Sequence, residues 1–320
     1  MPHQLGLFDP GPSPFRRRLR ERLAELAGDG IWIGTSSWKY EGWLGQVYSP
    51  ERYQVRGRFS QKRFRQECIA EYAETFPIVC GDFSFYQFPS PEYWARLFGG
   101  APAGLQFAFK VPEDITVKVF PPHPRYGTRA GEENPSFLDS AILDRMFLEP
   151  LAPYQERVPL LIFEFGAFSE GSYARGEDFA ADLDRFLETL PPGHRYGVEI
   201  RNREFLGPDY LGCLRQHGVA HVFNAWTRMP ELGAQFAHPG IHTTDFTVTR
   251  ALLRMGRPYA MAVKRFQPYD KMQEENPGAR DALRDIIRRA QQRREGAYVF
   301  VNNRLEGNAP GTIAAVTGVD

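Results

Sequence analysis

The stretch Arg195-Tyr196-Gly197-Val198-Glu199-Ile200-Arg201 is a short apolar run that ends in charged residues. Residues two apart on a β-strand share a face, so Glu199 and Arg201 lie opposite Val198 and Ile200. Seven similar runs recur along the chain, at 31–38, 78–88, 105–112, 159–166, 220–226, 259–266 and 297–303. Segments with helical spacing separate most of them. This alternation predicts an α/β fold, the TIM (β/α)8 barrel.

The length of 320 residues exceeds that of a usual barrel. We therefore expect a flexible arm over residues 1–14 and a single barrel domain over residues 15–320. That domain would include an amphipathic helix at its amino-terminal end, where arginines alternate with leucines. No repeat of fixed period accompanies the β/α alternation.

Composition excludes several classes of protein. The net charge is +0, so no global field favours nucleic acid or a membrane. Three cysteines without paired spacing, Cys68, Cys80 and Cys213, argue against a disulfide framework and predict a cytoplasmic location. No apolar stretch approaches the ~20 residues of a membrane span, and the first residues do not have the pattern of a signal peptide.

Strand alternation also predicts which side chains point into the barrel. On three expected strands, Lys110, Glu164 and Lys264 follow small or apolar inward positions. A charged group that faces a barrel lumen is paired or functional. The catalytic candidates are Glu199, Glu164 and Lys110. The ligand-binding candidates are Trp38, Tyr40, Trp43, Asp82, Tyr86, Arg201, Asn224, Lys264, Asn302 and Asn303.

Two interpretations of this charged ring stay open. In the first, a structural network balances Lys110, Arg201 and Lys264 against Glu164 and Glu199. In the second, a carboxylate acts as general acid or base while a cation stabilises an anionic ligand. Active sites of TIM barrels lie at the carboxyl ends of the strands, which favours the second interpretation.

Several motifs resemble one known family. They are Gly34-Thr35-Ser36-Ser37-Trp38-Lys39-Tyr40, Ser84-Phe85-Tyr86, Phe107-Ala108-Phe109-Lys110-Val111-Pro112, Val198-Glu199-Ile200-Arg201 and Tyr298-Val299-Phe300-Val301-Asn302-Asn303. In this order they are similar to the YecE-like family, also called domain of unknown function 72. The resemblance implies a TIM barrel, with a general likeness to the xylose-isomerase and abasic-site endonuclease barrels. It implies no established reaction.

The chain also departs from the family pattern, which is typical of a divergent branch. Cys80 and Asp82 stand where the family usually has glutamate and asparagine, and Glu164 stands in place of a glutamine. On the expected seventh strand, Lys264 and Phe266 replace the usual arginine and histidine. Arg304 replaces an aspartate after the paired asparagines.

The sequence contains few motifs that would bind a metal ion or a cofactor. No histidine belongs to an HxH or HExxH pattern, and the nearest candidates are His221 and His242. The sequence predicts no resident metal and no cofactor. A transient magnesium ion held by Glu164, Glu199 or Asp82 stays open as an alternative.

Residues 39–65 carry a local excess of positive charge. Seven lysines and arginines stand against two glutamates, which gives 7 − 2 = +5 in a neutral protein. Aromatic residues interleave with these charges, at Trp38, Tyr40, Trp43, Tyr48 and Tyr53. This mixture suits the stacking of bases or sugars and the pairing of phosphates. The alternative is a solvated basic loop whose aromatic rings pack on the barrel rim.

The amino-terminal arm contains Gln4-Leu5-Gly6-Leu7-Phe8, which resembles the short peptide that docks replication and repair proteins on the DNA sliding clamp. Gln4, Leu5, Leu7 and Phe8 are the predicted contacts. Packing of these apolar residues on the barrel stays open as an alternative.

The leading hypothesis is a TIM-barrel protein that binds a phosphorylated ligand at the carboxyl ends of its strands. That ligand could be nucleic acid, with a repair-linked hydrolase as one form of the activity. A sugar or sugar-phosphate enzyme and a non-catalytic adaptor for the sliding clamp are the alternatives.

Overall fold

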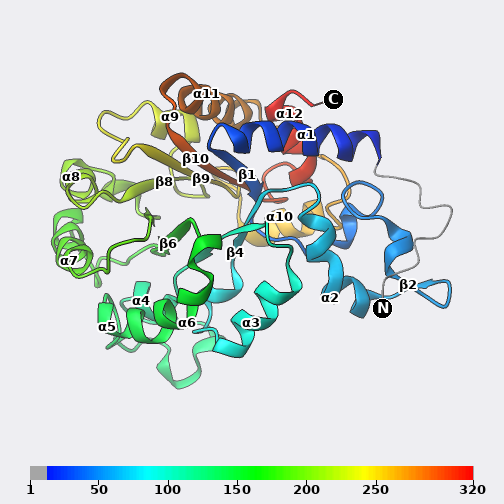
Figure 1. Ribbon diagram of the computed structural model, residues 1–320. Coiled ribbons are helices and arrows are strands. Elements are labelled where there is room, and N and C mark those ends of the chain that lie inside the picture. Colours follow the sequence, from blue (N-terminus) through cyan, green and yellow to red (C-terminus); the bar gives the residue numbers. More distant parts are fainter. Residues whose placement is uncertain (1–12, 320) are drawn as a thin grey trace.

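The computed structural model describes residues 13–319 and contains a closed barrel of parallel strands (Figure 1). The strand order around the barrel is β1-β10-β9-β8-β7-β6-β5-β4, with every neighbouring pair parallel. The strands are β1 (Ile31–Thr35), β4 (Ile78–Gly81), β5 (Gln106–Lys110), β6 (Leu160–Glu164), β7 (Tyr196–Glu199), β8 (Ala220–Ala225), β9 (Phe246–Ala251) and β10 (Gly296–Val301). The predicted (β/α)8 fold is confirmed.

The barrel interior is filled by one of the two faces of each strand. This inner cluster holds Ile78, Cys80, Ala108, Leu160, Ile162, Ala220, Val222, Phe246, Val248, Tyr298 and Phe300. Gly197 of β7 belongs to the same face, because a Cβ there would lie 2.9 Å from the side chain of Val222. The next inward position on each strand, two residues further on, therefore reaches the carboxyl-terminal opening. We call this opening the mouth.

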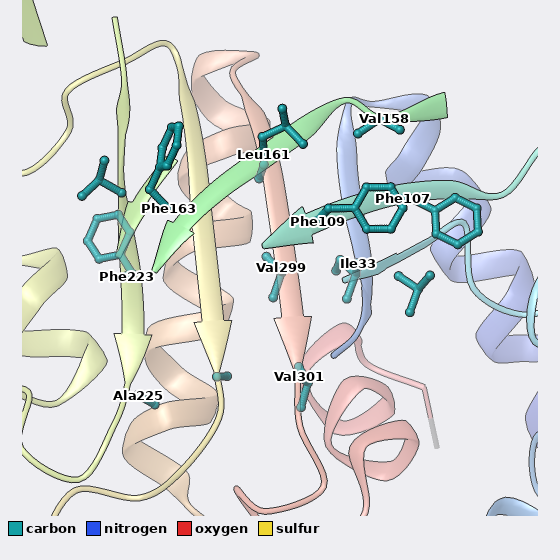
Figure 2. Packing of buried hydrophobic residues seen from close by; sticks show 14 of the residues in the cluster. Ile33, Phe107, Phe109, Val158, Leu161, Phe163, Phe223, Ala225, Val299 and Val301 are labelled. Atoms are coloured by element: carbon teal, nitrogen blue, oxygen red, sulfur yellow. The ribbon is translucent and has the colours of Figure 1, made fainter. Parts of the chain in front are cut away.

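Helices surround the barrel and cover the outward faces of the strands. They are α2 (Gln61–Tyr72), α3 (Pro91–Gly100), α7 (Gly176–Glu188), α8 (Pro208–Gln216), α9 (Leu232–Phe236), α11 (Pro277–Arg293) and α12 (Ala309–Thr317). α10 (Tyr259–Phe266) packs instead against Leu252 and Leu253, which follow β9. Figure 2 shows outward residues such as Phe109, Leu161 and Val299 in this outer layer. No helix in residues 13–319 is both long and apolar enough to cross a bilayer.

Two connections contain several short elements of their own. Between β1 and α2 lie η1 (Glu41–Trp43), η2 (Pro50–Tyr53) and the small hairpin β2 (Gln54–Val55) and β3 (Arg58–Phe59). Between β5 and β6 lie α4 (Glu113–Thr116), η4 (Pro124–Arg129), α5 (Ser140–Leu143), η5 (Asp144–Leu148), α6 (Glu149–Leu151) and η6 (Ala152–Arg157). Two short turns, η3 (Phe83–Phe85) and η7 (Arg203–Phe205), follow β4 and β7.

The amino-terminal amphipathic helix is α1 (Pro14–Gly28), which buries Leu19, Leu23 and Leu26 and contacts β1. Its Arg16 is buried and donates to Glu71 of α2 at 2.6 Å. Figure 1 shows α1 beside α12 on the outside of the barrel. Arg16 thus joins α1 to α2.

The seventh strand differs from the prediction. Residues 259–266 were expected to be a strand, but they form α10, and β9 (Phe246–Ala251) occupies the seventh place. In 259–266 the apolar residues recur at three- and four-residue steps as well as alternately, and the helix buries Ala262 and Phe266 on one face. Lys264 therefore does not point into the barrel.

A close approach holds the β1–α2 connection against the chain that follows α10. A Cβ on Gly42 would lie 2.1 Å from the carbonyl oxygen of Pro268, which leaves room for no other residue there. Nearby, the rings of Tyr40 and Tyr269 meet edge to face with centroids 5.5 Å apart. These two segments form one wall beside the mouth.

Candidate functional site

Arg250, on β9, stands at the centre of the mouth. Its side chain is 2% exposed, and its Nη1 donates to an oxygen of Glu164 and to one of Glu199, both at 2.5 Å. Its Nη2 donates to Oδ1 of Asp82 at 3.1 Å. Inward positions of four strand ends, β4, β6, β7 and β9, are thereby joined through one guanidinium.

Two further cations complete the arrangement. The Nζ of Lys110 lies 3.1 Å from Glu164 and 3.3 Å from Asp82. Arg201 lies 2.9 Å from an oxygen of Glu164 and 2.9 Å from one of Glu199. We call Asp82, Lys110, Glu164, Glu199, Arg201 and Arg250 the mouth cluster. The structure thus brings together five residues that the sequence predicted for this site.

The mouth cluster is internally neutral, with three carboxylates and three cations. Burial alone would raise the pKa of Glu164, but Arg201, Lys110 and Arg250 lower it well below its usual range. Burial would lower the pKa of Lys110, and the carboxylates of Asp82 and Glu164 outweigh that effect, so the pKa is raised. Because Glu164 stays ionised and all its oxygens are paired, it is poorly suited to donate or accept a catalytic proton.

Aromatic rings surround the cluster. The guanidinium of Arg201 lies 3.6 Å from the ring centroid of Trp226, and Lys110 lies 3.8 Å from that of Phe85. Tyr86 is 55% exposed, and Arg125 approaches its ring at 5.1 Å. Tyr86 is therefore the predicted ligand-binding ring that is most open to solvent.

Two predicted asparagines face the mouth. Asn224, on β8, is fully buried and donates its amide to the carbonyl oxygens of Ile200 and Val222 at 3.1 and 3.3 Å. Its Oδ1 has no hydrogen-bond partner among the described residues, and neither has Nε of Arg250, its register partner on β9. Asn302 donates to Ser36 and accepts the backbone N–H of Arg304 at 3.0 Å.

Three predicted ligand-binding residues lie elsewhere. Lys264 is an exposed residue of α10. Trp43 is fully buried, and its indole N–H donates to Oδ1 of Asn303 at 3.2 Å. The same oxygen of Asn303 accepts the N–H of Ala309 at 2.8 Å, at the start of α12. Trp43 and Asn303 therefore support the core, which corrects the expectation that they contact a ligand.

Tyr40 is half-buried between Trp43 and Tyr269, and burial raises the pKa of its hydroxyl to about 12. It packs against the apolar cluster of α10, formed by Leu252, Leu253, Ala262, Phe266 and Tyr269. The neutral phenol is thus part of the wall beside the mouth.

Sequence reasoning missed Arg250. Phe246, Val248 and Arg250 alternate with threonines, so the strand ends in a charge like the other runs, which is the signal that could have found it. The charged residue near the end of the seventh strand is therefore Arg250, and Lys264 lies on α10.

A second charged feature lies beside the mouth, between α2 and α3. A cavity of about 490 Å³ is lined there by Trp38, Lys39, Arg65, Gln66, Tyr93 and Arg96, among others. We call it the α2–α3 groove. Lys39 lies 5.2 Å from the ring centroid of Trp38, and Arg96 lies 5.5 Å from that of Tyr93. Trp38 lies three residues after the end of β1, which places this side of the groove at the carboxyl-terminal end of the barrel.

The three cations of the groove have no carboxylate partner. Within residues 13–319, Lys39, Arg65 and Arg96 form no ion pair, and no acidic residue is found among those that line the cavity. Two other cations of the basic segment 39–65 are compensated, since Arg52 pairs with Glu74 at 2.6 Å and Arg63 pairs with Glu67 at 3.0 Å. The predicted positive excess is therefore concentrated in part at this groove.

The other two predicted stacking residues of segment 39–65, Tyr48 and Tyr53, are buried. Tyr48 is 1% exposed, and Tyr53 is 2% exposed and donates to Glu71 at 2.6 Å. They belong to the core together with Trp43. Of the predicted stacking residues, Trp38 is the one that lines the groove, although its ring is mostly buried.

The carboxylates proposed for magnesium are engaged by cations. Glu164 and Glu199 share one nitrogen of Arg250, so a metal ion between them would have to displace that guanidinium. The buried imidazole of His221 donates or accepts at Tyr210, 3.1 Å away, and lies outside the mouth cluster. The predicted clamp contacts Gln4, Leu5, Leu7 and Phe8 lie outside the described residues.

The fold and the site define a class: a TIM-barrel protein whose mouth is closed by a buried, internally neutral ion cluster. Within that class, the chain belongs to the family described as "Protein of unknown function DUF72", whose model matches residues 32–318.

Solved structures of the same family share the fold. A DUF72 family protein from Thermotoga maritima is 20% identical, with a TM-score of 0.57 over 90% of this chain and 97% of that one. A DUF72 family protein from Enterococcus faecalis is 17% identical, with a TM-score of 0.57 over 91% of this chain and 96% of that one. No curated protein matches the chain significantly.

Proposed function

We propose that the protein binds a phosphorylated ligand in the α2–α3 groove, and that the macromolecular form of this ligand is single-stranded nucleic acid. The observation that carries the proposal is the convergence of three unpaired cations, Lys39, Arg65 and Arg96, on one cavity of about 490 Å³. Unpaired guanidinium and ammonium groups attract phosphate, and Arg binds it with two parallel hydrogen bonds.

The rings of the groove add the second element of such a site. Tyr93 is half-buried on α3 and leaves part of its ring toward the cavity. Single-stranded nucleic acids bind where cations follow the backbone and aromatic rings stack on the bases. The mouth cluster offers less to an anion, because each of its cations already has a carboxylate partner.

Fluorescence anisotropy of a labelled single-stranded oligonucleotide tests the proposal. With three phosphate contacts, the logarithm of affinity should fall with the logarithm of salt concentration with a slope of about −2. Reversing two charges, in the Arg65→Glu/Arg96→Glu variant, should reduce the affinity at least about tenfold and flatten that slope. Arg294→Glu, just before β10 at the opposite end of the barrel, is the matched control.

Binding that is absent at low salt, or that is equally strong in both variants, would overturn the proposal. Inorganic pyrophosphate serves as a second probe, because it measures the phosphate contacts without base stacking. If pyrophosphate binds and the oligonucleotide does not, the proposal of a phosphorylated ligand stands and that of nucleic acid is rejected.

A second candidate is a small-molecule site at the mouth, of the kind a sugar or sugar-phosphate enzyme would use. It is favoured by the unpaired Oδ1 of Asn224 and the unpaired Nε of Arg250, an acceptor and a donor on residues that are register partners of neighbouring strands. A sugar phosphate that raises the melting temperature of the protein, and fails to do so in Asn224→Ala, would support this site. Loss of that shift in Arg65→Glu/Arg96→Glu alone would assign the ligand to the groove.

A further inference from the structure

Outside the barrel, where α7 packs against α8, three metal-ligating side chains converge. They are Asp184 of α7 and, from α8 and its C-terminal cap, Cys213 and His217. One ligand atom of each residue lies within 4.8 Å of the other two. None of the three belongs to the mouth cluster or to the α2–α3 groove.

Local structure explains why the three side chains meet. Cys213 and His217 are four residues apart, so one helical turn places both on the same face of α8. That face packs against α7, and the imidazole Nε2 of His217 lies 2.7 Å from Oδ1 of Asp184. Cys213 is 8% exposed, whereas the side chains of His217 and Asp184 are 14% and 43% exposed.

We propose that Asp184, Cys213 and His217 bind one divalent transition-metal ion of the zinc type, which joins α7 to α8. A thiolate, an imidazole and a carboxylate are ligands that zinc takes in four-coordinate sites. The exposed side of Asp184 leaves a fourth position to water, as in zinc sites with three protein ligands. The ligand chemistry excludes magnesium and calcium, which prefer oxygen atoms throughout.

Binding requires a small and balanced rearrangement. The thiol of Cys213 releases its proton to solvent, and the proton that Nε2 of His217 shares with Asp184 moves through solvent to Nδ1. The metal ion then takes the place between Nε2 and Asp184. Metal–ligand bonds of 2.0–2.3 Å separate tetrahedral ligands by somewhat more than the present 2.7 Å, so Asp184 has to move outward. That carboxylate lies partly in solvent and is free to do so.

Cobalt titration of the full-length, untagged protein, freed of metal and kept reduced with a phosphine, tests the site. We expect one Co²⁺ per chain, with a thiolate-to-cobalt charge-transfer band in the near ultraviolet that excess Zn²⁺ removes. Cys213→Ser should abolish this band, and His217→Gln should weaken binding at least tenfold. His123→Gln, which replaces the N-cap imidazole of η4 in the β5–β6 connection, is the matched control.

The inference is overturned if no charge-transfer band appears, or if the band persists unchanged in Cys213→Ser. Should Cys213→Ser fail to fold, Asp184→Asn and His217→Gln carry the test, because both change exposed or partly exposed side chains. Oligonucleotide binding by His217→Gln should equal that of the wild type. Failure of the metal-site proposal would therefore not affect the proposed function of the groove.

Discussion

The mouth cluster and the α2–α3 groove lie at the same end of the barrel but hold their charges in opposite ways. In the mouth, Arg250 is buried and touches three carboxylates. In the groove, Lys39, Arg65 and Arg96 are exposed and have no carboxylate partner among the described residues. In the mouth the positive charges are neutralised within the protein, whereas in the groove they face solvent without a carboxylate partner in the part of the chain that the structure describes.

This difference follows from the energetics of burial. A charge moved into a protein interior must be paired, because its uncompensated desolvation costs several kcal/mol. An exposed cation remains hydrated and needs no partner, so it stays available to an anionic ligand. Charge at the carboxyl ends of barrel strands is therefore weak evidence for a binding site until its partners are known.

The largest expected effect is in the mouth. Arg250→Met leaves the adjacent carboxylates of Glu164 and Glu199 without their shared cation, and we expect a loss of about 3–5 kcal/mol in the free energy of unfolding. Urea denaturation at neutral pH measures it. The groove variant Arg96→Met should change stability by less than about 0.5 kcal/mol. Equal losses in both variants would remove the distinction between the two regions.

The second-largest expected effect is the pH dependence of stability that the mouth cluster contributes. The folded pKa of Glu164 is lower than its unfolded value of about 4.3, so the unfolded state binds the extra proton. The stability contributed by Glu164 is thus present above about pH 5 and is lost as pH falls through 4.3 toward the folded pKa. Urea denaturation at several pH values below 5 should show a shallower loss for Glu164→Gln than for the wild type.

Glu188→Gln, at the exposed end of α7, is the matched control for this pH series. It should keep the slope of the wild type. A slope for Glu164→Gln that is as steep as that of the wild type would show that other groups dominate acid unfolding.

The groove should respond in affinity instead of stability. Tyr93→Leu removes a ring that lines the cavity and should weaken oligonucleotide binding by about 1 kcal/mol, roughly fivefold. Affinity for inorganic pyrophosphate should stay unchanged, because the three cations remain. Parallel titrations of both probes make the measurement. A variant that loses both ligands equally would indicate a misplaced α3.

The smallest expected effect concerns Lys264. This residue is exposed on α10, so Lys264→Ala should change the free energy of unfolding by less than about 0.5 kcal/mol. Oligonucleotide affinity should also match the wild type. A large loss of stability would place Lys264 in the mouth cluster after all, in the position that the structure gives to Arg250.

Seven of the eight strands were predictable from short apolar runs, of which six have an inward charge or amide at the end and the first, β1, is followed by serines. The eighth was misplaced, since Tyr259–Phe266 satisfies strand and helix spacing at once and β9 carries threonines that read as surface residues. Periodicity cannot separate these cases. The charged end of Phe246–Ala251 was the better guide.

The site was predictable in position but not in its partners. Alternation brought Lys110, Glu164 and Glu199 to one opening, as the structure does. It could not show that one guanidinium would neutralise both carboxylates, because that depends on side-chain reach across the barrel. Nor could it show that Trp43 is buried while Trp38 borders a groove, since both follow the same strand.

The wall beside the mouth depends on glycine at position 42. Its hydrogen atom fits against the carbonyl of Pro268, where one methyl group would act as a wedge. An alanine there would prise the chain after α10 away from the first connection and shift Tyr269 from Tyr40. The absence of a Cβ at Gly42 therefore fixes the position of this wall beside the barrel opening.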